Sequence, residues 1–178
     1  MTDSKETKDS GCASCDYSLA FLLLRLWLAV RAILAGVEKF GAYQSVQKPL
    51  IDPATGQPDP SGVLVNVDIK YYSLTNYSGI PASLKDRFAN EPLLPHPALA
   101  AFDHLLGPVF IVTGVMLLIG LGTRLSLFVQ GLLYLALTIG LILINQPDGI
   151  AWLGIHVALV AFALMLAKHN KLALLKKW

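Results

Sequence analysis

Residues 98–121, ALAAFDHLLGPVFIVTGVMLLIGL, and residues 125–144, LSLFVQGLLYLALTIGLILI, decide the fold. The first run has Asp103 and His104 near its start and is uncharged after them, and the second run has no charge at all. At a rise of about 1.5 Å per residue, each run is long enough to cross a hydrocarbon core of about 30 Å. Because core helices of soluble proteins keep a polar face toward water, both runs predict transmembrane helices.

Two further runs of this kind lie toward the ends of the chain. Residues 17–37 are apolar apart from Arg25, Arg31 and a few small polar residues, and residues 150–167 are apolar around His156. The first run is longer than a secretory signal core of about 7–15 residues and contains arginines, which favours a permanent helix. The sequence therefore predicts an all-α integral membrane protein, a four-transmembrane-helix bundle with a long loop between helices 1 and 2.

The composition agrees with a membrane protein. Of the 178 residues, 54% are hydrophobic and 15% are charged, and the mean hydropathy is +0.57. Average soluble domains have about 25% charged residues, so disorder is excluded and an ordinary soluble domain is disfavoured. The net charge of +2 lacks the basic surplus that nucleic-acid binding requires, so we expect the lipid bilayer, and no nucleic acid, as a partner.

The positive charges predict the orientation of the spans. Seven Lys and Arg residues lie on one side, in the N-tail 1–16, at Arg124 and in the basic C-tail 168–178, whereas the loop 38–97 has five. Cytoplasmic segments of membrane proteins have the excess of Lys and Arg. We therefore expect both termini in the cytoplasm.

The loop 38–97 is the main hydrophilic segment and contains eight of the ten prolines. That density forbids a long helix, so DPATGQPDPSG at 52–62 is predicted to be turn-rich or extended. Loops of this length between transmembrane helices are uncommon unless they have a task, such as covering a site or docking a partner.

Two stretches of this loop have patterns of their own. VLVNVDIKYYSL at 63–74 alternates enough to form a short strand or to lie along the membrane interface, and SLKDRFANE at 83–91 predicts a short helix with Ser83 as its N-cap. Three tyrosines would suit the aromatic belt at a membrane surface: Tyr71, Tyr72 and Tyr77.

Cys12 and Cys15 form a C-x-x-C motif in the N-tail. Two thiolates supply half of a zinc site, and such a pair can also act as a redox dithiol. The alternative is two incidental thiols that stay reduced in the cytoplasm. Because the chain has only these 2 cysteines, we predict no complete metal site within it, and the role of the pair stays open.

Ionisable residues at membrane depth give the sharpest functional signal. A charge near the bilayer centre costs about 2.5–3.5 kcal/mol on insertion scales, so such residues usually face a partner or a polar cavity. Counting along the helices predicts one layer near the outer face, with one residue at its rim and one deeper: Arg31, Asp103, His104 and His156, then Glu38 and Arg25. This layer predicts ligand or proton handling, with His104, His156 and Asp103 as the candidate catalytic residues, and the alternative is a layer that serves packing alone.

The run 125–144 adds an uncharged polar stripe. Three of its residues are spaced by four and a fourth follows seven positions later: Gln130, Tyr134, Thr138 and Asn145. The stripe either forms hydrogen bonds across the bundle or faces a small polar ligand. Two glycines on one face of the preceding run are expected to permit close helix contact: Gly107 and Gly114.

Two motifs cover most of the chain outside the N-tail and the long loop. LLLRLWLAVRAILAGVEKFGAY at 22–43 contains arginine, glycine and a closing lysine-phenylalanine-glycine, and GVMLLIGLGTRLSLFVQGLLYLAL at 114–137 contains a G-x5-G-x-x-T-R turn. With the fourth span, these motifs resemble the DoxX superfamily, and more closely its DoxD-like members. Many relatives have a glutamate before the paired glycines of the second helix, where this chain has Phe110.

The resemblance implies a small four-helix subunit of a respiratory or sulfur-oxidising redox complex in a bacterial inner membrane. DoxD-like relatives are associated with thiosulfate oxidation coupled to quinone reduction. A quinone cofactor, other subunits as partners and a role in a quinone-reducing oxidoreductase are therefore expected. Five residues are candidates for binding the cofactor: Arg31, Arg25, Tyr134, Gln130 and Glu38.

Two other functions remain open from the residues alone. A non-catalytic membrane subunit would use the Pro-rich outer loop and the basic C-tail to anchor or assemble larger partner proteins. A haem-binding subunit would use His104 and His156 as axial ligands, although two transmembrane histidines are weak support for haem. The sequence does not decide whether the chain is itself an enzyme.

Overall fold

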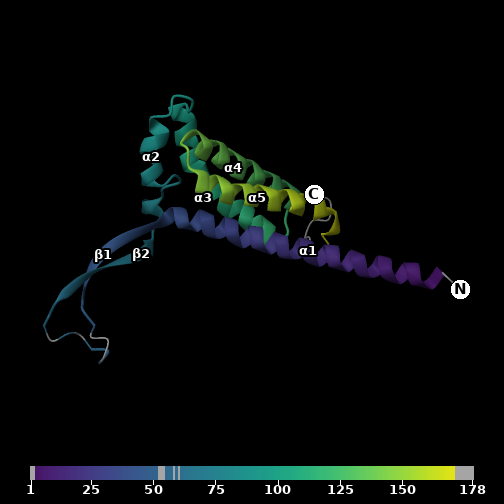
Figure 1. Cartoon of the computed structure of the whole chain (residues 1–178), viewed down its shortest axis with the longest axis horizontal. Helices are drawn as coiled ribbons and strands as arrows, with labels where there is room; N and C mark the ends of the chain where they lie inside the picture. Colours follow the sequence, from purple (N-terminus) through teal and green to yellow (C-terminus); the bar gives the residue numbers. More distant parts are fainter. Residues whose placement is uncertain (1–2, 52–54, 58, 60, 171–178) are drawn as a thin grey trace. The chain divides into compact units, whose positions relative to one another are not determined.

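The computed structural model describes residues 3–51, 55–57, 59 and 61–170, with side chains from Cys15 onward. The chain divides into two compact units, and Glu38–Tyr77 forms the smaller one. The larger unit is helical, with α1 (Asp3–Val37), α2 (Ala82–Ala89), α3 (His96–Ile119), α4 (Thr123–Leu143) and α5 (Pro147–Leu166) (Figure 1). The smaller unit contains β1 (Gly41–Pro49) and β2 (Leu64–Tyr72), with the short 3-10 helices η1 (Glu38–Phe40) and η2 (Leu74–Asn76).

Within the described residues, four helical segments are long and apolar enough to cross a membrane: Cys15–Phe40, His96–Ile119, Thr123–Leu143 and Pro147–His169. Large apolar side chains such as Leu23, Phe128 and Met165 lie on their outer surfaces. Hydrocarbon accommodates such a surface, whereas water does not. The four helices therefore indicate a multi-pass membrane protein in contact with lipid, as the apolar runs predict.

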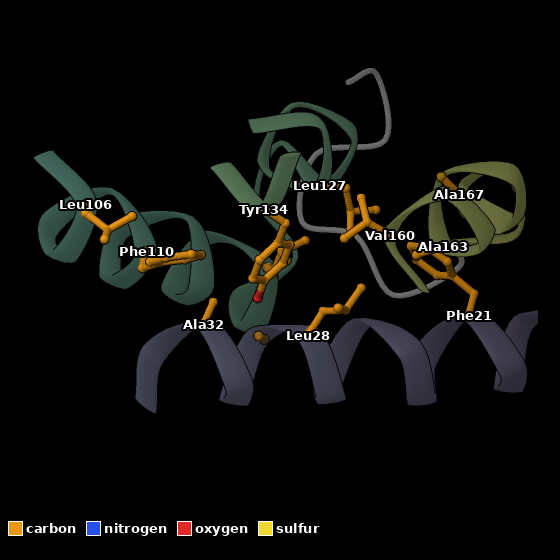
Figure 2. Close-up of a cluster of buried hydrophobic side chains, with 12 residues drawn as sticks. Phe21, Leu28, Ala32, Leu106, Phe110, Leu127, Tyr134, Val160, Ala163 and Ala167 are labelled. Carbon is orange, nitrogen blue, oxygen red and sulfur yellow. The ribbon is translucent and has the colours of Figure 1, made fainter. Parts of the chain in front are cut away.

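The four long helices pack in a ring. α1 contacts α3, α3 contacts α4, α4 contacts α5, and α5 returns to α1. The core of the ring receives buried side chains from every helix, including Leu28 from α1, Phe110 from α3, Leu127 from α4 and Val160 from α5 (Figure 2). The bundle therefore has one continuous core.

The contact between α1 and α3 depends on glycine. A Cβ atom on Gly114 would lie 2.7 Å from Cγ1 of Ile33 and 3.0 Å from the carbonyl oxygen of Ala29. A Cβ atom on Gly36 would lie 2.9 Å from the carbonyl oxygen of Gly107. The predicted role in close helix contact is thus confirmed for Gly114, where a larger side chain would push the two backbones apart, while the backbone of Gly107 closely approaches Gly36.

Left-handed residues close the two short turns of the bundle. Gly120 ends α3 at φ 78°, and the N–H of Leu121 donates to the carbonyl oxygen of Met116 at 2.8 Å. Asn145 follows α4 at φ 56°, and the N–H of Gln146 donates to the carbonyl oxygen of Leu141 at 3.0 Å. Glycine and asparagine tolerate this backbone conformation, so the sequence itself places antiparallel helices side by side here.

The segment 38–97, expected as a long loop, contains a small sheet and a helix. β1 and β2 pair antiparallel from Gly41 opposite Tyr72 to Pro49 opposite Leu64, which confirms a strand in 63–74. The all-α description therefore holds for the bundle and needs correction for the chain, because period-two alternation favours a strand over a helix.

The expected short helix in this segment is also present. α2 spans Ala82–Ala89, but its N-cap is Pro81 and no side chain caps it. The prediction of Ser83 as the N-cap was therefore wrong, because the helix already begins at Ala82 and Pro81 is its N-cap. The predicted turn-rich stretch 52–62 lies partly outside the described residues.

Candidate functional site

A group of buried polar side chains lies in the middle of the bundle. We define the polar centre as four residues, one from α3, two from α4 and one from α5: Thr113, Gln130, Tyr134 and His156. All four are buried, and Gln130 is completely inaccessible. Buried polar groups are normally hydrogen-bonded, so their partners indicate what this group does.

Gln130 joins α4 to α3. Its Nε2 atom donates to Oγ1 of Thr113 at 3.4 Å, and that hydroxyl donates to the carbonyl oxygen of Val109 at 2.7 Å. The amide oxygen Oε1 of Gln130 is buried and has no hydrogen-bond partner within the described part of the chain. Gln130 therefore presents a free acceptor to the interior of the bundle.

Tyr134 lies between two rings, one turn along α4 from Gln130. Its ring centroid is 5.4 Å from that of Phe110 and 5.1 Å from that of His156, and both pairs are tilted. The side chain points from α4 toward α1 (Figure 2). Its hydroxyl is buried and, among the residues described, forms no hydrogen bond. An O–H group in this state is a donor available to a ligand.

The backbone of α5 determines the tautomer of His156. Its Nδ1 atom lies 2.8 Å from the carbonyl oxygen of Trp152, and a carbonyl only accepts, so Nδ1 carries the hydrogen. In the neutral ring Nε2 is then an acceptor, and this buried atom has no hydrogen-bond partner in the described residues. His156 thus offers a proton-accepting atom beside Tyr134.

Two arginines of α1 have different surroundings. Arg31 is exposed on α1, and its charge acts on Tyr134. Arg25 is buried, and its Nη1 atom donates to Oδ1 of Asn170 at 3.1 Å, while Nδ2 of Asn170 donates to Oγ1 of Thr123 at 3.2 Å. Arg25 therefore ties α1 to the first residue of α4, about 16 Å along that helix from Tyr134.

Asp103 attaches the segment before α3 to that helix. Its Oδ1 atom accepts from the N–H of Ile80 at 2.5 Å, and Oδ2 lies 3.1 Å from Nζ of Lys85. A Cβ atom on Gly79 would lie only 2.0 Å from the carbonyl oxygen of Asp103, so the two backbones are in close contact. The next residue, His104, is exposed. Asp103 thus has a structural role in the described conformation.

Glu38 belongs to the smaller unit. Its carboxylate forms an ion pair with Lys70 and accepts from the hydroxyl of Tyr72 at 3.3 Å.

The two remaining residues of the predicted polar stripe, Thr138 and Asn145, lie outside the polar centre. Thr138 donates to the carbonyl oxygen of Tyr134 at 2.7 Å, and Asn145 is exposed in the turn after α4.

The structure therefore brings Tyr134, Gln130 and His156 together and gives Asp103, Arg25 and Glu38 other partners. Neither Thr113 nor the packing of Phe110 against Tyr134 was predicted from the sequence. The sequence does mark Thr113 as a candidate, since it is the only polar side chain between Phe110 and Gly120.

The described residues contain no cluster of metal-ligating side chains. There, no group of three or more His, Cys, Asp or Glu side chains is placed to hold a metal ion. Cys15 is an exposed free thiol, and the side chain of Cys12 lies outside the described residues.

No protein-family model, no curated protein and no solved structure matches the chain. The fold and the site nevertheless define a class of protein. The chain is a multi-pass membrane protein in which four apolar helices surround a buried polar centre.

Proposed function

We propose that the chain is a DoxX-like integral membrane subunit of a respiratory or sulfur-oxidising redox complex, and that its polar centre binds the headgroup of a quinone. The supporting observation is the set of three buried polar atoms without partners among the described residues: Oε1 of Gln130, the hydroxyl of Tyr134 and Nε2 of His156. Leaving such an atom unpaired costs about 1–3 kcal/mol, so the site favours a ligand that pairs with these atoms.

The chemistry of these atoms fits a quinone. A quinone supplies a two-electron, two-proton acceptor with carbonyl oxygens in its oxidised form and hydroxyl groups in its reduced form. The hydroxyl of Tyr134 donates to an oxygen of the headgroup, and Oε1 of Gln130 accepts from a hydroxyl of the reduced form. The rings of Phe110 and Tyr134 supply apolar contact area for a flat headgroup.

His156 is the proton-handling group in this proposal. Its Nδ1 atom is held by the carbonyl oxygen of Trp152, which leaves Nε2 to exchange a proton with the ligand. Arg31 contributes positive charge near Tyr134, which favours electron-rich oxygen atoms at this place. Electrons come from a partner redox subunit, so the chain acts as the quinone-binding member of a complex in a bacterial inner membrane.

Direct binding tests this proposal. The purified protein in nanodiscs is titrated with decylubiquinone, and binding is followed by quenching of tryptophan fluorescence. Tyr134→Phe removes one hydrogen bond, so we expect the Kd to rise about tenfold. His156→Asn retains a donor for Trp152 but lacks Nε2, and we expect a similar loss. Thr138→Val is the matched control, because its hydroxyl bonds only to its own helix in the described contacts and its loss leaves the Kd unchanged.

Two alternatives predict different results. In a non-catalytic anchor, Tyr134→Phe and His156→Asn leave decylubiquinone binding unchanged, and only the recovery of partner subunits falls. In a haem protein, the purified sample has a Soret band that His156→Asn removes. Either result would contradict quinone binding at the polar centre.

A further inference from the structure

The β1–β2 ribbon has one apolar face. In an antiparallel pair, residues on alternate positions share a face, and the register places Ala42 opposite Tyr71 and Val46 opposite Val67. The N–H of Leu50 donates to the carbonyl oxygen of Val63 at 2.9 Å and continues this pairing. We call these residues the ribbon's apolar face: Ala42, Gln44, Val46, Lys48, Leu50, Val63, Val65, Val67, Ile69 and Tyr71.

This face is uncovered within the described structure. Val63 is 48% exposed, Val67 and Ile69 are each 38% exposed, and Tyr71 is 42% exposed. An isolated two-stranded hairpin is marginally stable in water and needs another surface against its apolar side. The ribbon therefore requires a covering surface of apolar chemistry.

The opposite face contains polar side chains that pair with one another. The hydroxyl of Ser45 donates to Oδ1 of Asp68 at 2.5 Å, and Lys70 pairs with Glu38. The Nζ atom of Lys70 also lies 5.7 Å and 5.4 Å from the ring centroids of Tyr43 and Tyr72. This face also includes Leu64, Tyr43 and Tyr72, but it holds the ion pair and most of the polar side chains, so the ribbon is amphipathic with period two.

The position of the ribbon in the chain points to its covering surface. Gly41, the first residue of β1, directly follows Phe40, the last residue of the first candidate span. The paired ends of the ribbon at Ala42 and Tyr71 therefore lie next to the boundary between lipid and water. Tyrosine is enriched at this boundary because its ring is apolar and its hydroxyl is polar.

We propose that the ribbon's apolar face lies on the lipid surface at the level of the headgroups, with Lys70 and Asp68 facing water. In the described part of the chain the sheet has two strands, so each strand has one edge without a neighbouring strand. The backbone groups on these edges need water, which excludes burial in the hydrocarbon core but permits a position among hydrated headgroups. The ribbon would thus act as the β counterpart of an interfacial amphipathic helix.

Two neighbouring residues on opposite faces provide the test. In full-length protein with Cys12→Ser and Cys15→Ser, Val67→Cys and Asn66→Cys are each labelled with an environment-sensitive NBD dye. The proteins are placed in phosphatidylcholine nanodiscs in which some lipids have a nitroxide near the top of the acyl chain. We expect nitroxide to quench the dye at position 67 several-fold more than at position 66, and aqueous iodide to show the opposite preference.

Two results would overturn the proposal. Equal access of iodide to both positions would show that the apolar face is open to water. Protection of position 67 from iodide without quenching by the nitroxide lipid would show that protein, either another part of the same chain or a second copy, covers this face instead of lipid. Neither result bears on decylubiquinone binding, which tests the polar centre separately.

Discussion

The bundle and the ribbon both expose large apolar side chains, but they are stabilised in different ways. The bundle buries a continuous core among four helices, with backbone contacts so close that glycine is required at Gly36 and Gly114. Within the described residues, the ribbon has a single pair of strands and its apolar face is exposed. Exposure alone therefore does not identify a lipid contact, because the period of the hydrophobic pattern and the packing behind it also matter.

This comparison predicts that the largest effect comes from overpacking the bundle. Gly114→Leu drives a side chain into Ile33 and the carbonyl oxygen of Ala29, so we expect a loss of about 3 kcal/mol or more of stability. Thermal unfolding in detergent, followed by circular dichroism, measures the change. Gly154→Leu on α5 is the matched control, because a Cβ atom there meets nothing within 4 Å. Equal melting temperatures for the two variants would show that the α1–α3 contact is looser than described.

An intermediate effect is expected where Asp103 attaches the segment 79–85 to α3. Asp103→Ala leaves the N–H of Ile80 without its acceptor, so we expect a loss of about 1–3 kcal/mol. Lys85→Ala removes only the more exposed partner of the ion pair, and we expect less than about 1 kcal/mol. Similar losses in the two variants would mean that the ion pair, and not the backbone hydrogen bond, holds this segment.

The smallest effect is expected in the ribbon. The hydrogen bond to Glu38 raises the pKa of Lys70. The stability that this pair gives the ribbon is therefore fully present below the ordinary pKa of lysine and is lost as pH rises through the raised pKa. Lys70→Met should therefore speed hydrogen exchange in β1 and β2 at neutral pH and leave the melting temperature of the bundle unchanged. Lys48→Met, which removes the same charge from the other face, should affect exchange less. A lower melting temperature for Lys70→Met would argue that the two units unfold together.

Much of the fold could be predicted because its signals are local. Uncharged apolar runs indicate helices without knowledge of their neighbours, and the alternation in VNVDIKY indicates a strand. The glycine pair Gly107 and Gly114 already indicated a close helix contact. The N-cap of α2 was predicted at the wrong residue, because the helix begins at Ala82 after Pro81 and therefore already includes Ser83.

The site was harder to predict for a geometric reason. Counting residues gives the depth of a side chain along its helix, but it does not give the direction in which the side chain points once the helices pack. Asp103 and His156 were expected in one layer, yet Asp103 contacts Ile80 and Lys85 whereas His156 contacts Tyr134. Partners that arrive from a distant segment, such as Ile80 for Asp103, cannot be read from periodicity.

The membrane class of this protein and its four apolar helices follow from local sequence, as does the alternation that favours a strand in 63–74, because hydropathy and period depend on neighbouring residues alone. Which polar residues form the centre of the bundle depends on how the helices pack. Packing of α3, α4 and α5 leaves Gln130, Tyr134 and His156 buried together with polar atoms unpaired among the described residues, while it gives Arg25 and Asp103 partners of their own. Burial and partner choice depend on the rotation of each helix in the ring, and the packing of all four helices sets that rotation.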